Sequence, residues 1–240
     1  MKKNWSAIIP AAGKSKRFES KKSKILYKYK KKTIIEHIVD KVKNKVKDII
    51  IISNKKNYIE LKRIFKNKKK KNFKIILQSK KNGMAIAIQT GLMHTKTKFF
   101  CSIWGDQIGL TDLTISRLLN SHQLNKFSVT LPVLYQKKPY VNAIIKKNYF
   151  LDKMVQSRET GFTEAEGFSD CGFFCCNTSF IKNRLNNLIR NKKIVTKKTN
   201  EYDFLLALNI LAKKNKIKLI KTINKKDAVG INKINDLKKI

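Results

Sequence analysis

The alternation of strand-like and helix-like segments along this 240-residue chain predicts an α/β fold, a three-layer α/β/α, Rossmann-like arrangement around a mixed, mostly parallel sheet. Two observations support this class. Short apolar runs recur with amphipathic segments between them, and the early runs are continuously apolar, as in strands buried on both faces. The 42% hydrophobic content is ordinary for a globular protein, so we expect residues 1–240 to form a single domain.

The first strand and the first helix have the clearest signals. The stretch "WSAIIPA" (5–11) predicts the strand, and "TIIEHIVDKVKN" (33–44) predicts the helix, because Thr33 and Glu36 have the spacing of a capping box. The same alternation continues to residue 135. We expect there a strand at 48–53, a helix near 55–67, a strand at 73–78, a helix beginning near Gly83, a strand at 98–106, a helix at about 112–122 and a strand at 127–135.

From about residue 135 to residue 178 the pattern changes to shorter extended runs separated by polar turns. This change predicts a small strand-rich insertion (135–178) that lines one side of a cleft. Two helices, near 179–190 and 201–213, and the strand "IKLIKTI" (217–223) then complete the sheet.

The net charge of +39 raises the question of nucleic-acid binding, because basic surfaces attract phosphate backbones. Only six of the 55 basic residues are Arg, whereas bidentate recognition of bases and phosphates favours Arg over Lys. The lysine-rich run 66–72 also lacks aromatic residues. We therefore expect no specific nucleic-acid partner.

No apolar run approaches the roughly 20 residues that a membrane-spanning helix needs. The first apolar run is short, is broken by Pro10 and ends in cations, unlike a secretory signal. We expect a cytoplasmic protein without membrane insertion.

The four cysteines lie in apolar stretches and are expected to be buried, reduced thiols. Neither zinc nor a disulfide is expected, because the histidines His37, His94 and His122 are distant in sequence. The cysteines are Cys101, Cys171, Cys175 and Cys176.

Ligands of open α/β sheets bind beyond the carboxyl ends of the strands. Four unusual stretches follow predicted strands or close the chain: "AAGKSKR" (11–17), "LQSKKNGMA" (77–85), "WGDQ" (104–107) and "VGIN" (229–232). These stretches are the candidates for a binding site.

The stretch 11–17 combines small residues with cations. Backbone N–H groups in a tight glycine turn can bind a phosphate, and Lys14, Lys16, Arg17 and Lys24 add positive charge, so a polyphosphate is the expected ligand. The alternative is an ordinary strand-to-helix turn, because the stretch lacks the spacing of a P-loop or a dinucleotide-binding motif.

Asp106 ends an otherwise apolar run, where a carboxylate is costly unless it is paired or binds a metal. Mg²⁺ is the expected cofactor, because it usually takes one or two protein oxygens and completes its octahedron with substrate phosphates and water. A capping role for Asp106 before Thr111 and Asp112 is the alternative.

Taken in order along the chain, the four stretches resemble the motifs of the sugar-1-phosphate nucleotidyltransferase family, closest in layout to its uridylyltransferase domains that activate N-acetylglucosamine 1-phosphate. The family's AAG-x-G-[TS]-R-[MF] and P-K resemble "AAGKSKRF" (11–18) and "SKIL" (23–26). Its Gln and Gly-Thr-x-x-Ala element resembles Gln78 and "GMAIA" (83–87). Its GD and G-[VI]-N motifs resemble Gly105-Asp106 and "GIN" (230–232).

The resemblance implies a sheet of the nucleotide-diphospho-sugar transferase type and transfer of a nucleoside monophosphate from UTP or dTTP to a sugar 1-phosphate. It implies Mg²⁺ ligands at Asp106 and Asn232 and catalytic roles for Arg17, Lys24 and Asp106. Nucleotide contacts are implied at Ala11, Ala12, Gly13, Lys14, Arg17, Lys24, Gln78, Gly83, Met84 and Gly105, and sugar contacts at Asn142, Gln156, Asp170 and Gly172.

The sequence departs from the family pattern at several of these positions. Ser15 replaces a Gly, Lys16 a Thr or Ser, and Ser23 a Pro, and in the sugar-binding segment Asp170 replaces an Asn and only Gly172 is retained. Because a carboxylate lacks the amide's donor group, N-acetylglucosamine 1-phosphate is not the expected acceptor.

Several alternatives stay open. One is a cytidylyltransferase acting on a polyol phosphate or an acidic sugar. From other classes, the chain could be a basic nucleic-acid-binding protein or a catalytically inactive regulator. A homo-oligomer is compatible with each of these hypotheses.

Overall fold

The computed structural model of the chain describes residues 2–13, 15, 18, 23–66, 72–78, 82–125, 127–214 and 216–240. In this part of the chain, ten strands form one mixed sheet in the order β10-β8-β9-β12-β7-β11-β6-β1-β4-β5. The strands are β1 (Trp5–Ala11), β4 (Asp48–Ser53), β5 (Phe73–Leu77), β6 (Phe99–Ile103), β7 (Val129–Lys137), β8 (Val141–Lys146), β9 (Phe150–Gln156), β10 (Glu166–Asp170), β11 (Phe173–Asn177) and β12 (Ile217–Lys221).

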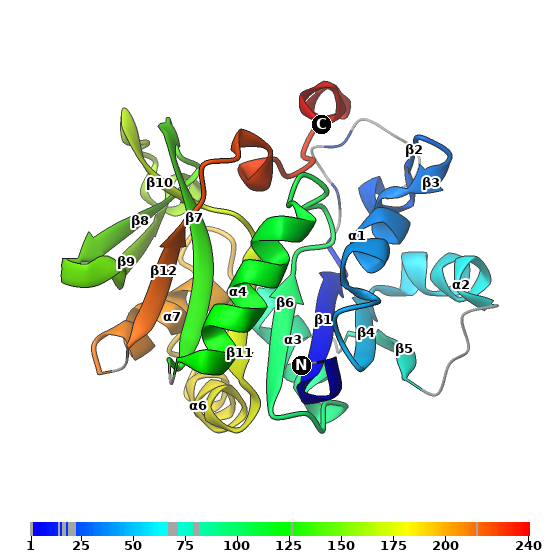
Figure 1. The fold of residues 1–240 in the computed structure, drawn as a ribbon, viewed down its shortest axis with the longest axis horizontal. Helices are drawn as coiled ribbons and strands as arrows, with labels where there is room; N and C mark the ends of the chain where they lie inside the picture. Colours follow the sequence, from blue (N-terminus) through cyan, green and yellow to red (C-terminus); the bar gives the residue numbers. More distant parts are fainter. Residues whose placement is uncertain are drawn as a thin grey trace.

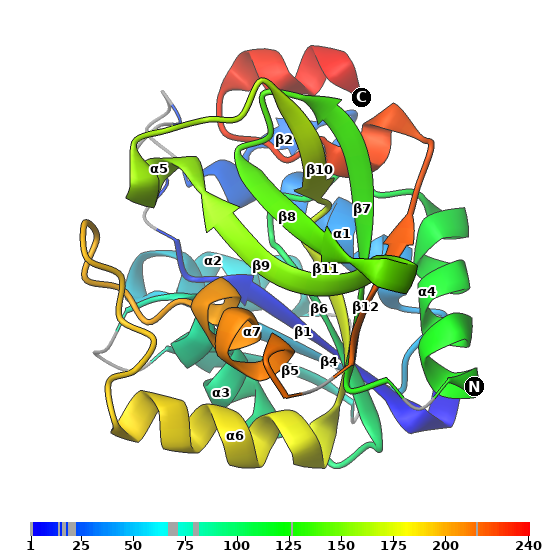
Figure 2. The ribbon, with the colours of Figure 1, turned by 90° about the vertical axis from the view of Figure 1, so that its left-hand side faces the viewer.

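Helices cover both faces of this sheet (Figure 1). Figure 2 shows α3, α6 and α7 on one side of the central strands and α4 on the other. The helices are α1 (Ile34–Val42), α2 (Lys55–Ile64), α3 (Met84–Met93), α4 (Asp112–Leu124), α5 (Ser157–Thr160), α6 (Thr178–Arg190) and α7 (Phe204–Ala212). Shorter elements are η1 (Lys2–Asn4), η2 (Lys24–Leu26), η4 (Lys147–Tyr149), η5 (Lys225–Ala228), η6 (Ile234–Lys239) and the β2 (Lys28–Tyr29) and β3 (Lys32–Thr33) pair.

Alternate residues of the central strands enter two separate cores. Ile8 of β1 packs with residues of α3, α6 and α7, whereas its neighbours Ala7 and Ile9 pack with residues of α1, α2 and α4. The side chains of a strand alternate between the two faces of its sheet, so a strand covered by helices on both sides must be apolar throughout. This explains the continuous apolar runs and confirms the predicted three-layer α/β/α class.

The two halves of the sheet differ in strand direction. β6, β1, β4 and β5 are parallel, with Ile8 opposite Ile50, whereas β8, β9, β10 and β11 make antiparallel pairs. The antiparallel strands come from the region that the sequence predicts as strand-rich. The carboxyl ends of the parallel strands meet at one edge, where the loops carry the predicted motifs.

The predicted capping box is confirmed at α1. The Glu36 N–H donates to Thr33 Oγ1 over 3.4 Å, and the Thr33 N–H donates to the Glu36 carboxylate over 2.8 Å. The predicted strand 98–106 ends earlier, at Ile103, because the next N–H groups leave the strand ladder: Trp104 donates to the carbonyl of Gly172 and Gly105 to that of Pro10.

The four cysteines are free and buried, as predicted. Burial raises the pKa of the Cys101 thiol to about 12. No helix within the described ranges is both long and apolar enough to cross a membrane.

Candidate active site

A cleft lies at the edge where β1, β5 and β6 end, and most of the predicted nucleotide-binding residues line it. These are Ala11, Ala12, Gly13, Lys24, Gln78, Gly83, Met84 and Gly105, and the predicted metal ligand Asp106 lines the cleft with them. Residues that the sequence analysis did not select, among them Trp104, Arg158, Glu201 and Asp203, complete the lining. Lys14, Lys16 and Arg17 lie outside the described residues, so their predicted roles stay predictions.

Lys24 and Asp106 form an ion pair in the cleft. The Lys24 ammonium contacts the Asp106 carboxylate and also donates to the carbonyl of Ile231 over 3.1 Å. The two side chains are 17% and 20% exposed, so water reaches the pair only partly. Two of the four predicted stretches, "WGDQ" and "VGIN", therefore meet at the ammonium of Lys24, which stands in "SKIL" (23–26).

The turn after β1 is held by polar side chains that the sequence analysis did not identify. Asn54 Nδ2 donates to the carbonyl of Ala12 over 3.0 Å, and Asn57 Nδ2 donates to Ser23 Oγ over 3.2 Å. Asn57 is 2% exposed. These asparagines lie at the start of α2, which directly follows the neighbouring strand β4.

Ser15 has a φ of 51°, in the left-handed region where glycine is favoured, and it stands where the family has Gly. Its hydroxyl makes two contacts that a glycine could not make. It accepts from the N–H of Lys24 over 3.2 Å and lies 3.2 Å from Ser23 Oγ. The departure at Ser15 therefore joins the turn directly to the segment that carries Lys24.

The GD turn and the C-terminal segment "VGIN" (229–232) are joined through their backbones. The Ile231 N–H donates to the Asp106 carbonyl over 2.9 Å, and the Gly109 N–H donates to the Val229 carbonyl over 3.2 Å. A Cβ on Gly230 would lie 2.9 Å from Gln107 Oε1, which explains the glycine. The N–H of Asn232 donates to the Asp236 carboxylate over 2.9 Å.

Buried hydrogen bonds of Asp227 fix the chain just before the segment "VGIN" (229–232). It is fully buried, and its carboxylate accepts hydrogen bonds from the Thr111 N–H and hydroxyl and from the hydroxyls of Thr114 and Thr222. Its carbonyl accepts from Gln107 Nε2 over 2.7 Å. A buried carboxylate with this many donors fixes the loop between β12 and "VGIN" against the start of α4.

The oxygen atoms around the Lys24 ammonium are of the type that a hard cation such as Mg²⁺ binds. A carboxylate of Asp106 and a carbonyl of Ile231 already hold one ammonium, and Asn232 follows in the chain. The described residues contain no group of three or more His, Cys, Asp or Glu side chains that could hold a metal. Mg²⁺ needs only one or two protein oxygens, so the two ligands predicted at Asp106 and Asn232 would suffice in number, and that assignment stays a prediction.

Gly83 approaches another backbone closely. It has a φ of 116°, and a Cβ there would lie 2.2 Å from the carbonyl oxygen of Tyr202. On either side of it, the Tyr202 N–H donates to the Asn82 carbonyl and the Ala85 N–H to the Tyr202 carbonyl, both over 3.0 Å. The predicted base-binding segment thus packs on residues 201–203.

None of the four predicted sugar-binding residues is among the described residues that line the cleft, so their predicted role stays a prediction. Asn142 packs against Gly167, where a Cβ would lie 2.4 Å from Asn142 Oδ1. Gln156 Oε1 accepts from Arg158 Nε over 3.2 Å. The Asp170 carboxylate accepts from the Gly172 N–H over 3.1 Å, and burial raises the pKa of Asp170 to about 7.

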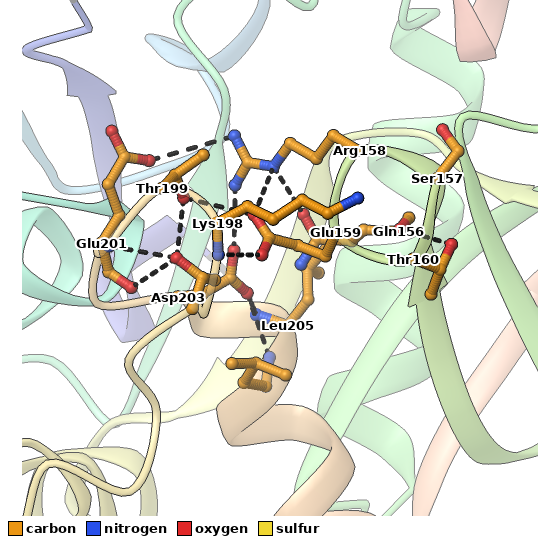
Figure 3. A network of polar contacts seen from close by, with 12 residues as sticks. Gln156, Ser157, Arg158, Glu159, Thr160, Lys198, Thr199, Glu201, Asp203 and Leu205 are labelled. Atoms are coloured by element: carbon orange, nitrogen blue, oxygen red, sulfur yellow. Dashed lines mark hydrogen bonds and ion pairs between the residues drawn. The ribbon is translucent and has the colours of Figure 1, made fainter. Parts of the chain in front are cut away.

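Arg158 is the cation of the cleft that the sequence analysis missed. Its guanidinium lies among Glu159, Glu201 and Asp203 (Figure 3). The sequence carries a signal for Asp203 alone: "EYD" (201–203) stands directly before the apolar helix 204–212, where an Asp at the N-cap position is favoured.

Two curated relatives match almost the whole chain. The chain is 27% identical over 238 residues to the bifunctional protein GlmU of Buchnera aphidicola subsp. Schizaphis graminum, covering 97% of this chain and 49% of that protein. It is 25% identical over 231 residues to the bifunctional protein GlmU of Alkaliphilus metalliredigens, covering 94% and 49%. The chain therefore spans about half the length of the curated relatives it matches.

Two solved structures share the fold. A structure titled "Putative Glucose-1-Phosphate Thymidylyltransferase" from Bacillus anthracis, in complex with a sucrose, aligns with a TM-score of 0.76 at 17% identity, covering 98% of this chain and 93% of that chain. The 4-diphosphocytidyl-2C-methyl-D-erythritol synthase from Anaerococcus prevotii aligns with a TM-score of 0.68 at 15% identity, covering 99% and 96%.

The domain family described as MobA-like NTP transferase matches residues 7–161. The match begins in β1 and ends just after Arg158, so it includes the turn after β1, the GD turn and the predicted base-binding segment. The resemblance predicted from the sequence is confirmed, and the chain belongs to the MobA-like NTP transferase domain family.

Proposed function

We propose that this protein is a Mg²⁺-dependent nucleotidyltransferase that transfers a nucleoside monophosphate from UTP or dTTP to a sugar 1-phosphate and releases pyrophosphate. The observation that carries the proposal is the convergence of Lys24, Asp106 and the "VGIN" segment at one edge of the sheet. Family membership and the similarity to GlmU proteins support it.

The reaction requires two mutually repelling polyanions to be held together. A phosphate oxygen of the acceptor attacks the α-phosphorus of the triphosphate, the bond from that phosphorus to the bridging oxygen breaks, and pyrophosphate leaves. The attacking oxygen is already anionic near neutral pH, so the step needs no general base. Positioning and charge neutralisation are what the protein must supply.

The residues of the cleft can meet both needs. The N–H groups of the turn after β1 can bind phosphate oxygens, and Lys24, which lines the same cleft, would neutralise charge on the leaving group. Asp106 and Asn232 would hold Mg²⁺, which neutralises phosphate charge and orients the phosphates when it is bound. The Lys24–Asp106 pair would separate when the substrate phosphates enter.

Gln78 and the backbone at Gly83 are our candidates for reading the base, since both line the cleft. A pyrimidine edge offers the carbonyl and N–H groups that a Gln side chain and a main-chain amide can pair with. The alternative is a cytidylyltransferase acting on a polyol phosphate or an acidic sugar, which the structural similarity to the Anaerococcus synthase keeps open at the level of fold.

Pyrophosphate release from purified protein, measured over a matrix of UTP, dTTP, CTP, ATP and GTP against sugar and polyol phosphates, tests the proposal. Turnover with UTP or dTTP and a hexose 1-phosphate is the expected result, with N-acetylglucosamine 1-phosphate expected to be a poorer acceptor. Turnover with CTP and a polyol phosphate alone would establish the alternative. A chain without turnover that retards DNA at physiological salt would support the nucleic-acid hypothesis.

A further inference from the structure

Arg158 connects two parts of the cleft that lie far apart in the chain. It belongs to the short helix α5, at the end of β9, and its side chain is 33% exposed. Its Nη2 donates to Asp203 over 3.3 Å, and its Nη1 lies 3.9 Å from the Glu201 carboxylate. Arg158, Glu201 and Asp203 all line the cleft, so this contact forms part of the cleft wall (Figure 3).

Asp203 depends on this arginine for charge compensation. The residue is 5% exposed, and its second carboxylate oxygen accepts from the N–H groups of Leu205 and Leu206 at the start of α7. A buried carboxylate left without its cation is strongly unfavourable. Loss of the Arg158 guanidinium would therefore drive Asp203 toward water and disturb the segment that precedes α7.

That segment also supports the predicted base-binding loop. Tyr202, between Glu201 and Asp203, exchanges backbone hydrogen bonds with Asn82 and Ala85 on either side of Gly83. Because a Cβ at Gly83 would overlap the Tyr202 backbone, the two chains are in direct contact and cannot shift independently.

A second contact joins α5 to the same segment. The Glu159 carboxylate accepts from the Lys198 N–H over 3.1 Å and from the Thr199 hydroxyl over 3.2 Å (Figure 3). The loop 196–203 is thus held by two consecutive residues of α5, one acidic and one basic.

We propose that Arg158 is a positioning residue that couples α5, which follows Gln156 at the end of β9, to the predicted base-binding loop (82–85). Its planar guanidinium contacts the carboxylates of Glu201 and Asp203 at the same time. These two residues flank Tyr202, whose backbone contacts Gly83. A lysine offers one point charge and cannot span the same two carboxylates. The kinetic consequence of this coupling rests on the proposed function, whereas the structural consequence does not.

Hydrogen exchange tests the structural part. In Arg158→Gln, the amides of Ala85 and Tyr202 should exchange at least about tenfold faster than in the wild type, which corresponds to about 1.4 kcal/mol of lost protection. The core amides of β1 should keep their rates. Arg63→Gln is the matched control, because it removes an arginine that pairs with a single surface carboxylate, Glu60. Unchanged exchange at Ala85 and Tyr202 would overturn the proposal.

A second variant, Arg158→Lys, decides the question if Arg158→Gln speeds hydrogen exchange throughout the chain. Arg158→Lys retains a charge near Asp203 but not the planar guanidinium, so faster exchange should be confined to residues 82–85 and 201–203. Protection equal to the wild type in Arg158→Lys, with faster exchange throughout the chain in Arg158→Gln, would assign Arg158 a general role in stability and overturn the coupling.

Steady-state kinetics test the functional part, with UTP and the sugar phosphate of highest turnover. We expect Arg158→Gln to raise KM for both substrates about tenfold and to change kcat by less than about threefold, as loss of uniform binding does. A rise confined to the acceptor KM would indicate a direct acceptor contact and contradict the coupling. Absence of turnover in the wild-type protein would refute the proposed function instead, and the exchange experiment would still decide the role of Arg158.

Discussion

The N–H of Ile231 donates to the carbonyl oxygen of Asp106 over 2.9 Å, which joins the last motif of the chain to the turn after β6. Asp106 lies on this turn, and its carboxylate forms an ion pair with the Lys24 ammonium. The same ammonium donates to the carbonyl of Ile231. The backbone therefore fixes how far Asn232 can lie from Asp106. This relationship makes Asp106 the residue whose loss should be most informative.

Asp106→Asn should lower kcat/KM by about a hundredfold or more while the protein stays folded. The amide keeps the size of the side chain but removes the charge that would hold Mg²⁺ and pair with Lys24. Pyrophosphate release at saturating Mg²⁺ measures the loss, and thermal unfolding checks the fold. Asp112→Asn is the control, because its side chain is 71% exposed at the start of α4. Near-normal turnover in Asp106→Asn would refute the metal assignment.

Lys24→Ala should lower kcat/KM by on the order of a hundredfold, because a preorganised cation is lost beside the developing charge. Lys66→Ala, at an exposed position after α2, should leave the kinetics unchanged within error. Both variants remove one positive charge from a chain whose net charge is +39. Equal effects at both positions would mean that diffuse charge attracts the substrate, and would favour the nucleic-acid hypothesis.

The sequence predicted those parts of the molecule that have a local signature. Continuous apolar runs identified the central strands, because strands covered on both faces contain few polar residues. The Thr33–Glu36 capping box placed the start of α1, since its hydrogen bonds join residues three apart. The motifs at 11–17, 104–107 and 229–232 were found at the strand ends where ligands of such sheets bind.

Contacts between distant segments could not be predicted in the same way. Gly83 has no side chain, and its close approach to Tyr202 is a backbone contact without a residue pattern. Arg158 is one of six arginines, and nothing near it in the sequence identifies Glu201 and Asp203 as its partners. Asn54 and Asn57 likewise reach the turn after β1 only because β4 lies beside β1.

The base preference is expected to depend on Gln78. The enzyme should prefer UTP or dTTP over ATP and GTP by at least about tenfold, or about 1.4 kcal/mol, which is modest for paired hydrogen bonds in a desolvated pocket. Gln78→Ala should reduce this preference more than it slows the best substrate. Values of kcat/KM for each triphosphate give the ratio, and an unchanged ratio in the variant would exclude Gln78 as the base reader.

The stability of the protein should depend on pH through Asp170. Burial raises the pKa of Asp170 from 3.8 to about 7, so between these values the folded chain holds a proton that the unfolded chain has lost. The contribution of Asp170 to the free energy of unfolding therefore falls as the pH rises from about 4 to 7, by up to about 1.4 kcal/mol per pH unit. Asp170→Asn keeps an acceptor for the Gly172 N–H and removes the titration.

Asp170→Asn should accordingly be more stable relative to the wild type at pH 8 than at pH 5, as measured by urea unfolding at both pH values. Asp152→Asn is the control, because it makes the same substitution at a carboxylate that is 49% exposed. In the opposite trend, the free energy of unfolding of the wild type would increase relative to that of Asp170→Asn as the pH rises. This would mean that Asp170 is ionised and stabilised in the folded chain. In that case Asp170 would be a charged group of the folded chain at neutral pH.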